Sequence, residues 1–214
     1  MSNRSTLIIA LVLIAAAVAL SVSVYGRLPQ PMASHWGTDD QVNGTISRFW
    51  GAFLMPVMAL AMLGLFLLIP SIDPLKANIA KFRGFFNNFI VLLMVFFLYV
   101  HVLTILWNLG VQSFRMSSAL LPAVGLIFIL AGLMMRQAKR NFFIGIRTPW
   151  TLSSDRVWDE THRVGGPLFI ASGVLALLGA FLPGVVAYWL LLVPVLASTL
   201  FVVVYSYVLW RREQ

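Results

Sequence analysis

Long apolar runs alternate with short polar connections along the chain. The apolar runs cover six stretches of sequence, at residues 6–25, 50–70, 86–109, 117–135, 167–183 and 187–209. A helix needs about 20 apolar residues to cross the ~30 Å hydrocarbon core of a bilayer. Helices are the expected spanning elements, because backbone groups in lipid need internal hydrogen-bond partners. The pattern predicts an all-α integral membrane bundle of six transmembrane helices, forming a single domain over residues 1–214.

The composition also indicates an integral membrane protein. Of the 214 residues, 60% are hydrophobic and only 10% are charged, whereas about a quarter of the residues in a soluble domain are charged. The chain contains no cysteine, which excludes disulfides and thiolate chemistry. The first apolar run is longer than the core of a usual signal peptide and is followed by a poor cleavage site. We therefore expect a retained helix.

The distribution of basic residues predicts how the helices are oriented. Arg27, Arg48 and Arg115 lie on one side of the predicted membrane, and all the other Lys and Arg residues lie on the opposite side. Because basic connections stay in the cytoplasm, both termini and the connection 136–166 are predicted to be cytoplasmic, in a multi-pass protein of the cell membrane. The connection 26–48 then faces outward. Since this bias accounts for the net charge of +8, we expect no direct nucleic-acid binding.

Polar side chains recur along one face of the third apolar run. Asn87, His101 and Asn108 are separated by multiples of seven residues, which keeps them on one helix face, and Thr104 shares that face. Such side chains usually point toward neighbouring helices and not toward lipid. Hydrogen bonding between helices explains this polar stripe. The alternative is that it lines a polar cavity in a small-molecule or lipid transporter.

Turn signals and aromatic residues mark the outer connection, residues 26–48. Its prolines and its Asn-Gly pair predict turns, and Trp36 suits the headgroup region of a bilayer. His35 with Asp39 or Asp40 is a minimal ligand set for a metal, and a weak signal for one. A turn held at the membrane surface by aromatic anchors is the commoner use of such residues. We therefore expect no metal and no other cofactor.

The inner connection, residues 136–166, contains the signals of a short helix. Ser154 is a candidate N-cap, and a helix is predicted from there to about Arg163. The glycine pair 165–166 is predicted to end this helix, and Pro167 to begin the fifth span. The resulting element would be a short interfacial helix between the fourth and fifth transmembrane helices, lying against the cytoplasmic headgroups.

The predicted interfacial helix has two different faces. Trp158, Thr161 and His162 share one face, while Asp159 and Arg163 lie four residues apart on another face, at the spacing of an ion pair. The two tryptophans of the connection are expected to anchor the helix at the membrane surface. The connection therefore predicts an ordered cap and not a slack linker.

Two functions of this cap stay open at this stage. It either locks the fourth and fifth helices together, or provides a docking surface for a cytosolic protein or an anionic head group. The planar guanidinium of Arg147 suits oxyanions in the second case. Catalysis has little support, because His162 beside Asp159 and Glu160 is a local acid–base set on a solvated helix, and the sequence contains no HExxH or GxSxG motif. We expect a protein that is not an enzyme.

Two motifs resemble those of a known family. The segment "NFFIGIRTPWTLSSDRVWDETHRVGG" closely resembles the signature of the SdpI family, immunity proteins against the sporulation-delaying toxin of Bacillus. The outer segment "LPQPMASHWGTDDQVNG" resembles the LP–HW–G pattern of a domain of unknown function that commonly precedes this signature. The inner motif is matched at Asn141, Gly145, Ile146, Arg147, Thr148, Pro149, Trp150, Trp158, Thr161, His162 and Gly165. The outer motif is matched at Leu28, Pro29, His35, Trp36 and Gly44.

The resemblance implies a membrane immunity or resistance protein. Its first part, residues 1–70, would present an outer loop to a secreted peptide toxin or an envelope stress, and its signature region, residues 117–214, would recruit a cytosolic repressor through the cap. Besides the lipid bilayer, the expected partners are thus a toxin outside and a repressor inside. The candidate residues of the outer loop are Pro29, His35, Trp36, Asp39 and Gly44. The candidate residues of the cap are Asn141, Gly145, Arg147, Thr148, Pro149, Trp150, Trp158, Thr161 and His162.

Overall fold

The structure, a computed structural model, describes residues 1–182 and 184–214. Six helices in it are long and apolar enough to cross a membrane, which confirms the predicted number of spans. They are α1 (Asn3–Val24), α2 (Arg48–Ile72), α4 (Arg83–Asn108), α5 (Met116–Met135), α7 (Asp155–Gly179) and α8 (Gly184–Arg211). The shorter elements are a 3-10 turn (Tyr25–Arg27), strands β1 (Met32–Trp36) and β2 (Val42–Ile46), and helices α3 (Lys76–Lys81) and α6 (Pro149–Ser153).

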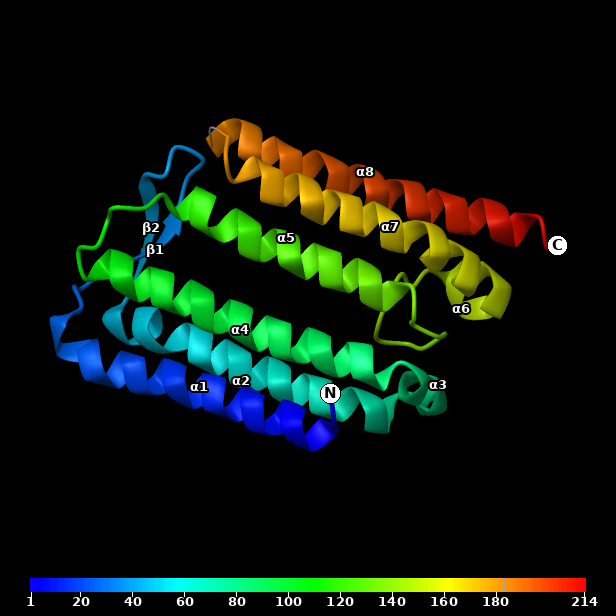
Figure 1. Cartoon of the computed structure of the whole chain (residues 1–214), viewed down its shortest axis with the longest axis horizontal. Helices are drawn as coiled ribbons and strands as arrows, with labels where there is room; N and C mark the ends of the chain where they lie inside the picture. The colour runs from blue at the N-terminus through cyan, green and yellow to red at the C-terminus, as the bar shows by residue number, and fades with distance from the viewer. Residues whose placement is uncertain (183) are drawn as a thin grey trace.

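The long helices form two groups of three that lie side by side (Figure 1). One group contains α1, α2 and α4, the other contains α5, α7 and α8, and the groups meet where α4 packs on α5. The hairpin of β1 and β2 lies at one end of the bundle, here called the hairpin end. Both termini, α3 and α6 lie at the opposite end, the cap end. The two connections that carry the motifs are therefore at opposite ends of one bundle.

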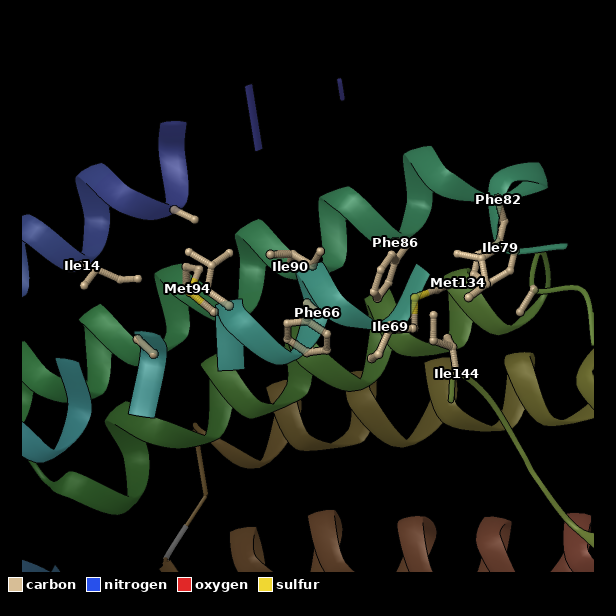
Figure 2. Close-up of a cluster of buried hydrophobic side chains, with 14 of the residues drawn as sticks. Ile14, Phe66, Ile69, Ile79, Phe82, Phe86, Ile90, Met94, Met134 and Ile144 are labelled. Carbon is tan, nitrogen blue, oxygen red and sulfur yellow. The ribbon is translucent and has the colours of Figure 1, made fainter. Parts of the chain in front are cut away.

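Apolar side chains at the cap end join the two groups of helices (Figure 2). Phe66 of α2 and Phe86 of α4 lie 5.7 Å apart in an edge-on arrangement, and Met134 of α5 belongs to the same cluster. Ile144, from the connection after α5, is buried beside them. A smaller cluster at the hairpin end contains Leu28, Met32, Ala52 and Ile105. Burial of this kind fixes the connections onto the ends of the helices.

Glycines allow α5 and α7 to pack with their backbones close together. A Cβ atom added to Gly125 would lie 2.7 Å from the carbonyl oxygen of Gly173, and one added to Gly132 would lie 2.5 Å from that of Gly166. Both pairs are seven residues apart along their helices, so they face each other on one stripe. Small residues at such positions are the usual means of close helix packing in membranes.

The same packing corrects the predicted start of the fifth span. The sequence predicted a short helix to Arg163, a stop at 165–166 and a new helix from Pro167, but α7 runs without a break from Asp155 to Gly179. The glycines serve the contact with α5 instead of ending the helix, and tertiary packing overrides their local preference. The predicted separate interfacial helix is therefore wrong. The sequence also predicts a tight turn at Pro183-Gly184 between the fifth and sixth spans, but Pro183 lies outside the described residues.

Candidate functional site

The loop between α5 and α6 is folded around the side chain of Asn141. Its Oδ1 accepts hydrogen bonds from the backbone N–H groups of Phe143 (2.9 Å) and Ile144 (2.6 Å). Its Nδ2 donates to the carbonyl oxygens of Lys139 (2.9 Å) and Ile144 (2.9 Å). These four bonds fill the ordinary capacity of a primary amide. Asn141, which is fully buried, therefore holds the loop and has nothing left to offer a partner.

His162 connects this loop to α7 through both of its ring nitrogens. Nδ1 lies 2.8 Å from the carbonyl oxygen of Trp158, and Nε2 lies 2.9 Å from the backbone N–H of Ile146. A carbonyl only accepts and an amide N–H only donates, so the proton sits on Nδ1 and Nε2 accepts. Gly145, with φ +111°, passes directly over the ring, and a Cβ at that position would overlap Nε2. The hydrogen bond of the neutral imidazole to Ile146 therefore depends on a glycine at position 145.

Trp158 is part of the interior and not a membrane anchor. Its side chain is 0% exposed, its indole N–H donates to the carbonyl oxygen of Ala138 at 2.8 Å, and its ring stacks on His162 at 4.1 Å. The predicted anchoring role is therefore wrong, because the loop after α5 folds over this face of α7. Trp150, the second tryptophan of the connection, is half-buried and packs against Tyr207 of α8 with 5.1 Å between the ring centroids.

Threonine hydroxyls attach α6 to its surroundings. Thr148 is the N-cap of α6 and forms a reciprocal capping box with Thr151, and Pro149 follows at the first helical position, where it is favoured. The hydroxyl of Thr148 lies 3.1 Å from that of Ser206 on α8, and the hydroxyl of Thr151 donates to the carbonyl oxygen of Ile146 at 2.8 Å. The short helix is thereby fixed between the loop and α8.

A buried carboxylate joins the cap to the first group of helices. Asp73, which follows α2 and is only 2% exposed, accepts a hydrogen bond from Leu75 N–H at 2.6 Å and another from Phe142 N–H at 2.9 Å. Nearby, Asn78 of α3 donates to the carbonyl oxygen of Arg140 at 2.9 Å. Asp73 is not among the residues predicted from the sequence. A lone acid after an apolar run looks like an ordinary helix end, and no signal in the sequence connects it with a loop 69 residues away.

Ion pairs on the outside of the cap differ from the predicted one. Asp159 pairs with Lys139 of the preceding loop at 3.1 Å, and Arg163 pairs with Glu160 one turn before it. The predicted pair of Asp159 with Arg163 is therefore wrong, because Lys139 of the loop occupies the position next to Asp159. All four side chains lie at the surface, where such pairs contribute about 1 kcal/mol or less.

Few of the candidate cap residues remain accessible. Arg147 is exposed and makes one hydrogen bond, from Nη1 to the carbonyl oxygen of Phe142 at 3.1 Å. Pro149 and the ring of Phe142 are exposed as well. Thr161 is fully buried, and its hydroxyl has no partner among the residues that the structure describes. The accessible part of the cap is therefore Arg147 and its exposed neighbours, while the rest of the motif is buried.

At the hairpin end, two polar side chains fix β1 and β2 onto the bundle. Asn108, the last residue of α4, accepts from the N–H of Ala33 (2.8 Å) and donates to its carbonyl oxygen (3.0 Å), as a neighbouring strand would. Both carboxylate oxygens of Asp40 accept from Ser117 of α5, one from its N–H and one from its hydroxyl, each at 2.8 Å. The hairpin therefore binds to α4 and to α5, one helix from each group.

Among the candidate residues of the outer loop, Pro29, His35 and Asp39 are exposed, whereas Trp36 and Gly44 are half-buried. His35 is bonded through Nδ1 to the side chain of Asn43, and a Cβ added to Gly44 would lie 2.9 Å from the Cβ of His35. Trp36 packs edge-on against Trp107 of α4 at 5.6 Å. This pair places the ring of Trp36 against the bundle, while His35 stays exposed.

The side chains of the possible metal site do not converge. Asp40 is bound to Ser117, Asp39 accepts from the N–H of Gln41 at 3.1 Å, and His35 is bonded to Asn43. Over residues 1–182 and 184–214, no group of three or more His, Asp or Glu side chains gathers in a way that would hold a metal ion. The weak metal hypothesis gains no support.

The polar stripe of α4 is used mainly for contacts between elements. Asn87 donates to the side chain of Asn3 at 2.8 Å, and Nε2 of His101 lies 3.0 Å from the hydroxyl of Ser21, so both bind α1. The residue of the stripe nearest the hairpin binds β1, as described above. Thr104 bonds within its own helix and lines a cavity of about 860 Å³ beneath the hairpin. A transport path along the stripe therefore has little support.

Comparisons with known proteins agree with the two motifs. Residues 137–206 match the SdpI/YfhL protein family, and residues 12–60 match the domain of unknown function DUF1648. The chain is 24% identical to "Immunity protein SdpI" of Bacillus subtilis (strain 168) over 205 residues, which cover 96% of each chain. No solved structure is significantly similar to it. The resemblance found in the sequence is confirmed: a region similar to the SdpI/YfhL family follows a region similar to DUF1648.

Proposed function

We propose that this chain is an immunity-type membrane protein that protects the cell against a secreted peptide toxin or an envelope stress. The observation that carries the proposal is the similarity to an immunity protein along 96% of both chains. In this reading the cap end lies in the cytoplasm and the hairpin end outside, because the basic residues concentrate at the cap end. Each motif would then have its own side of the membrane.

The hairpin is the proposed site of contact with the toxin or the envelope signal. It is bound firmly to α4 and α5, while His35 and the backbone around Gly44 stay at its surface. A preorganised surface of this kind binds without first paying for the ordering of a loop. The proposal assigns His35, Trp36 and Asp39 to this contact, with Pro29 and Gly44 shaping the hairpin.

The cap is the proposed site of signalling to a cytosolic repressor. Its interior is closed by the bonds of Asn141 and His162, so that recognition would depend on Arg147 and its exposed neighbours. Arg147 has donors to spare, since a guanidinium carries five N–H groups and the cap uses one bond from it. A carboxylate on the repressor would suit this side chain.

The protection itself is tested in a toxin-sensitive strain that lacks its own immunity protein. The wild-type chain should raise survival under challenge with the secreted toxin. Arg147→Ala should abolish protection while the amount of protein in the membrane stays the same, because Arg147 contributes only one exposed hydrogen bond to the fold. Arg156→Ala is the matched control, since this arginine is 77% exposed and lies on the same cap. Unchanged survival of cells with the Arg147 variant would contradict the role of the cap.

The signalling step needs a separate measurement. A fluorescently tagged repressor candidate should move to the membrane when toxin is added to cells with the wild-type chain, and should stay in the cytosol with Arg147→Ala. Survival without any movement of the repressor would support protection and refute signalling. Movement of the repressor without survival would support signalling and refute protection.

A further inference from the structure

The cavity of about 860 Å³ beneath the hairpin extends well into the apolar part of the bundle. Its walls include Val100 of α4 and Val124 of α5. Each of these lies eight residues from the hairpin end of its helix, which is Asn108 for α4 and Met116 for α5. At 1.5 Å per residue, the cavity reaches about 12 Å below the hairpin end. This depth is close to the thickness of one leaflet, which is about half of the ~30 Å hydrocarbon core.

An apolar chain is the occupant that these walls favour. Below the hairpin the lining consists mainly of apolar side chains, among them Met55, Leu121 and Leu191 from three different helices. Water placed there would find few hydrogen-bond partners, and an empty space would forfeit the dispersion contacts of its lining. The surrounding solvent in this region is acyl chain. A lipid chain that enters the cavity therefore fills it without either cost.

The roof of the cavity has a different chemistry from its walls. It is formed by the polar residues of the hairpin, among them Ser34, His35 and Asn43. Asp39 is the one Asp, Glu, Lys or Arg among the described lining residues, so the roof favours a cation. The ring of Trp36 also lines the cavity, but its indole nitrogen is covered by the protein and faces no ligand.

We propose that this cavity binds one membrane phospholipid whose head group carries an ammonium group. The acyl chain lies between α4 and α5, and the head group lies under the hairpin, with its ammonium at Asp39. The depth of the cavity suits an acyl chain of one leaflet, and the polar roof lies where the head group of such a lipid would be. The lipid site does not rest on the proposed immunity function, because lipid binding is measured on purified protein and protection is measured as survival.

The test uses the full chain in nanodiscs that contain equal amounts of phosphatidylethanolamine and phosphatidylglycerol. Native mass spectrometry then shows which lipid stays bound when the protein is released. The wild-type chain should retain one phosphatidylethanolamine. Val124→Trp, which fills the cavity, should reduce the retained fraction by about tenfold or more, since a tenfold change requires the loss of only about two buried CH2 groups of the chain. Leu120→Trp is a second filling variant, in case the first one does not fold.

The matched control is Leu126→Trp, on the same helix but 47% exposed and outside the lining. It should retain lipid as the wild-type chain does. Asp39→Asn should lower the preference for phosphatidylethanolamine over phosphatidylglycerol by about two- to fivefold, as expected for a partly solvated ion pair. The proposal is overturned if the wild-type chain retains no lipid or both lipids equally, or if folded filling variants retain as much lipid as Leu126→Trp does.

Discussion

Replacing Gly145 with alanine tests whether the cap is built around His162. Gly145 has φ +111°, where a residue with a side chain is strained, and its Cβ would overlap Nε2 of the imidazole. Gly110, between α4 and α5, also has a positive φ of +92°, but a Cβ there would meet no atom within 4 Å. The two substitutions therefore share the backbone strain and differ in the collision with the ring.

The expected effects follow from these two contributions. Strain at an unfavourable backbone conformation costs about 1–3 kcal/mol, and this applies to both Gly145→Ala and Gly110→Ala. At Gly145 the ring must also move, which breaks the 2.9 Å bond from Ile146 N–H to His162. A buried donor left without a partner costs about 1–3 kcal/mol, and overpacking adds a similar amount. Gly145→Ala should thus lower the free energy of unfolding by at least about 2 kcal/mol more than Gly110→Ala does.

Unfolding in mixed micelles with increasing detergent denaturant, followed by tryptophan fluorescence, measures this difference. A double-mutant cycle with His162→Ala adds a direct check of the mechanism. In the His162→Ala background, the loss in the free energy of unfolding caused by Gly145→Ala should fall to about the loss caused by Gly110→Ala. Equal destabilisation by the two single glycine variants would refute the reasoning. So would an undiminished cost of Gly145→Ala in the His162→Ala background.

Two further predictions concern the contacts that hold the helices together. Asp73→Asn should lower the free energy of unfolding by about 2–4 kcal/mol, because the two N–H groups bond to different carboxylate oxygens and the NH2 of asparagine would face one of them. Asp159→Asn at the surface should change it by about 1 kcal/mol or less in the same unfolding assay. Gly173→Ala should destabilise the bundle by about 1–3 kcal/mol, because its Cβ would meet the carbonyl oxygen of Gly125. Gly64→Ala, with nothing within 4 Å, should be neutral, and an equal loss in both would contradict the close packing of α5 and α7.

The six spans were predictable because hydrophobicity over about 20 residues is a local property of the sequence. The helix end predicted at Gly165–Gly166 was wrong for a physical reason that is not local in the sequence. Two glycines followed by proline are a normal helix stop, and the stop is cancelled here because Gly166 packs against the backbone of α5 at Gly132. A single sequence does not show which distant helix supplies that contact. The continuous helix α7 was therefore beyond what the local pattern can predict.

In the candidate site, too, the local pattern was predictable and the distant contacts were not. The spacing of Trp158 and His162 placed them on one face of a helix, and the structure buries that face. What covers the face is the loop 138–146, which folds back through Asn141, and this depends on contacts that periodicity does not encode. Asp73 was missed for the same reason, since its partner Phe142 is far away in the sequence.

The closed hydrogen bonding inside the cap changes how variants of this motif should be sorted in a genetic screen. Asn141 and His162 bond only within the protein, so substitutions there should remove the chain from the membrane by way of quality control. Substitutions at Arg147 should leave a normal amount of protein that has lost its activity. A screen that scores only survival would place both classes together. One that also measures protein level would separate the residues that build the cap from Arg147, for which a partner is proposed.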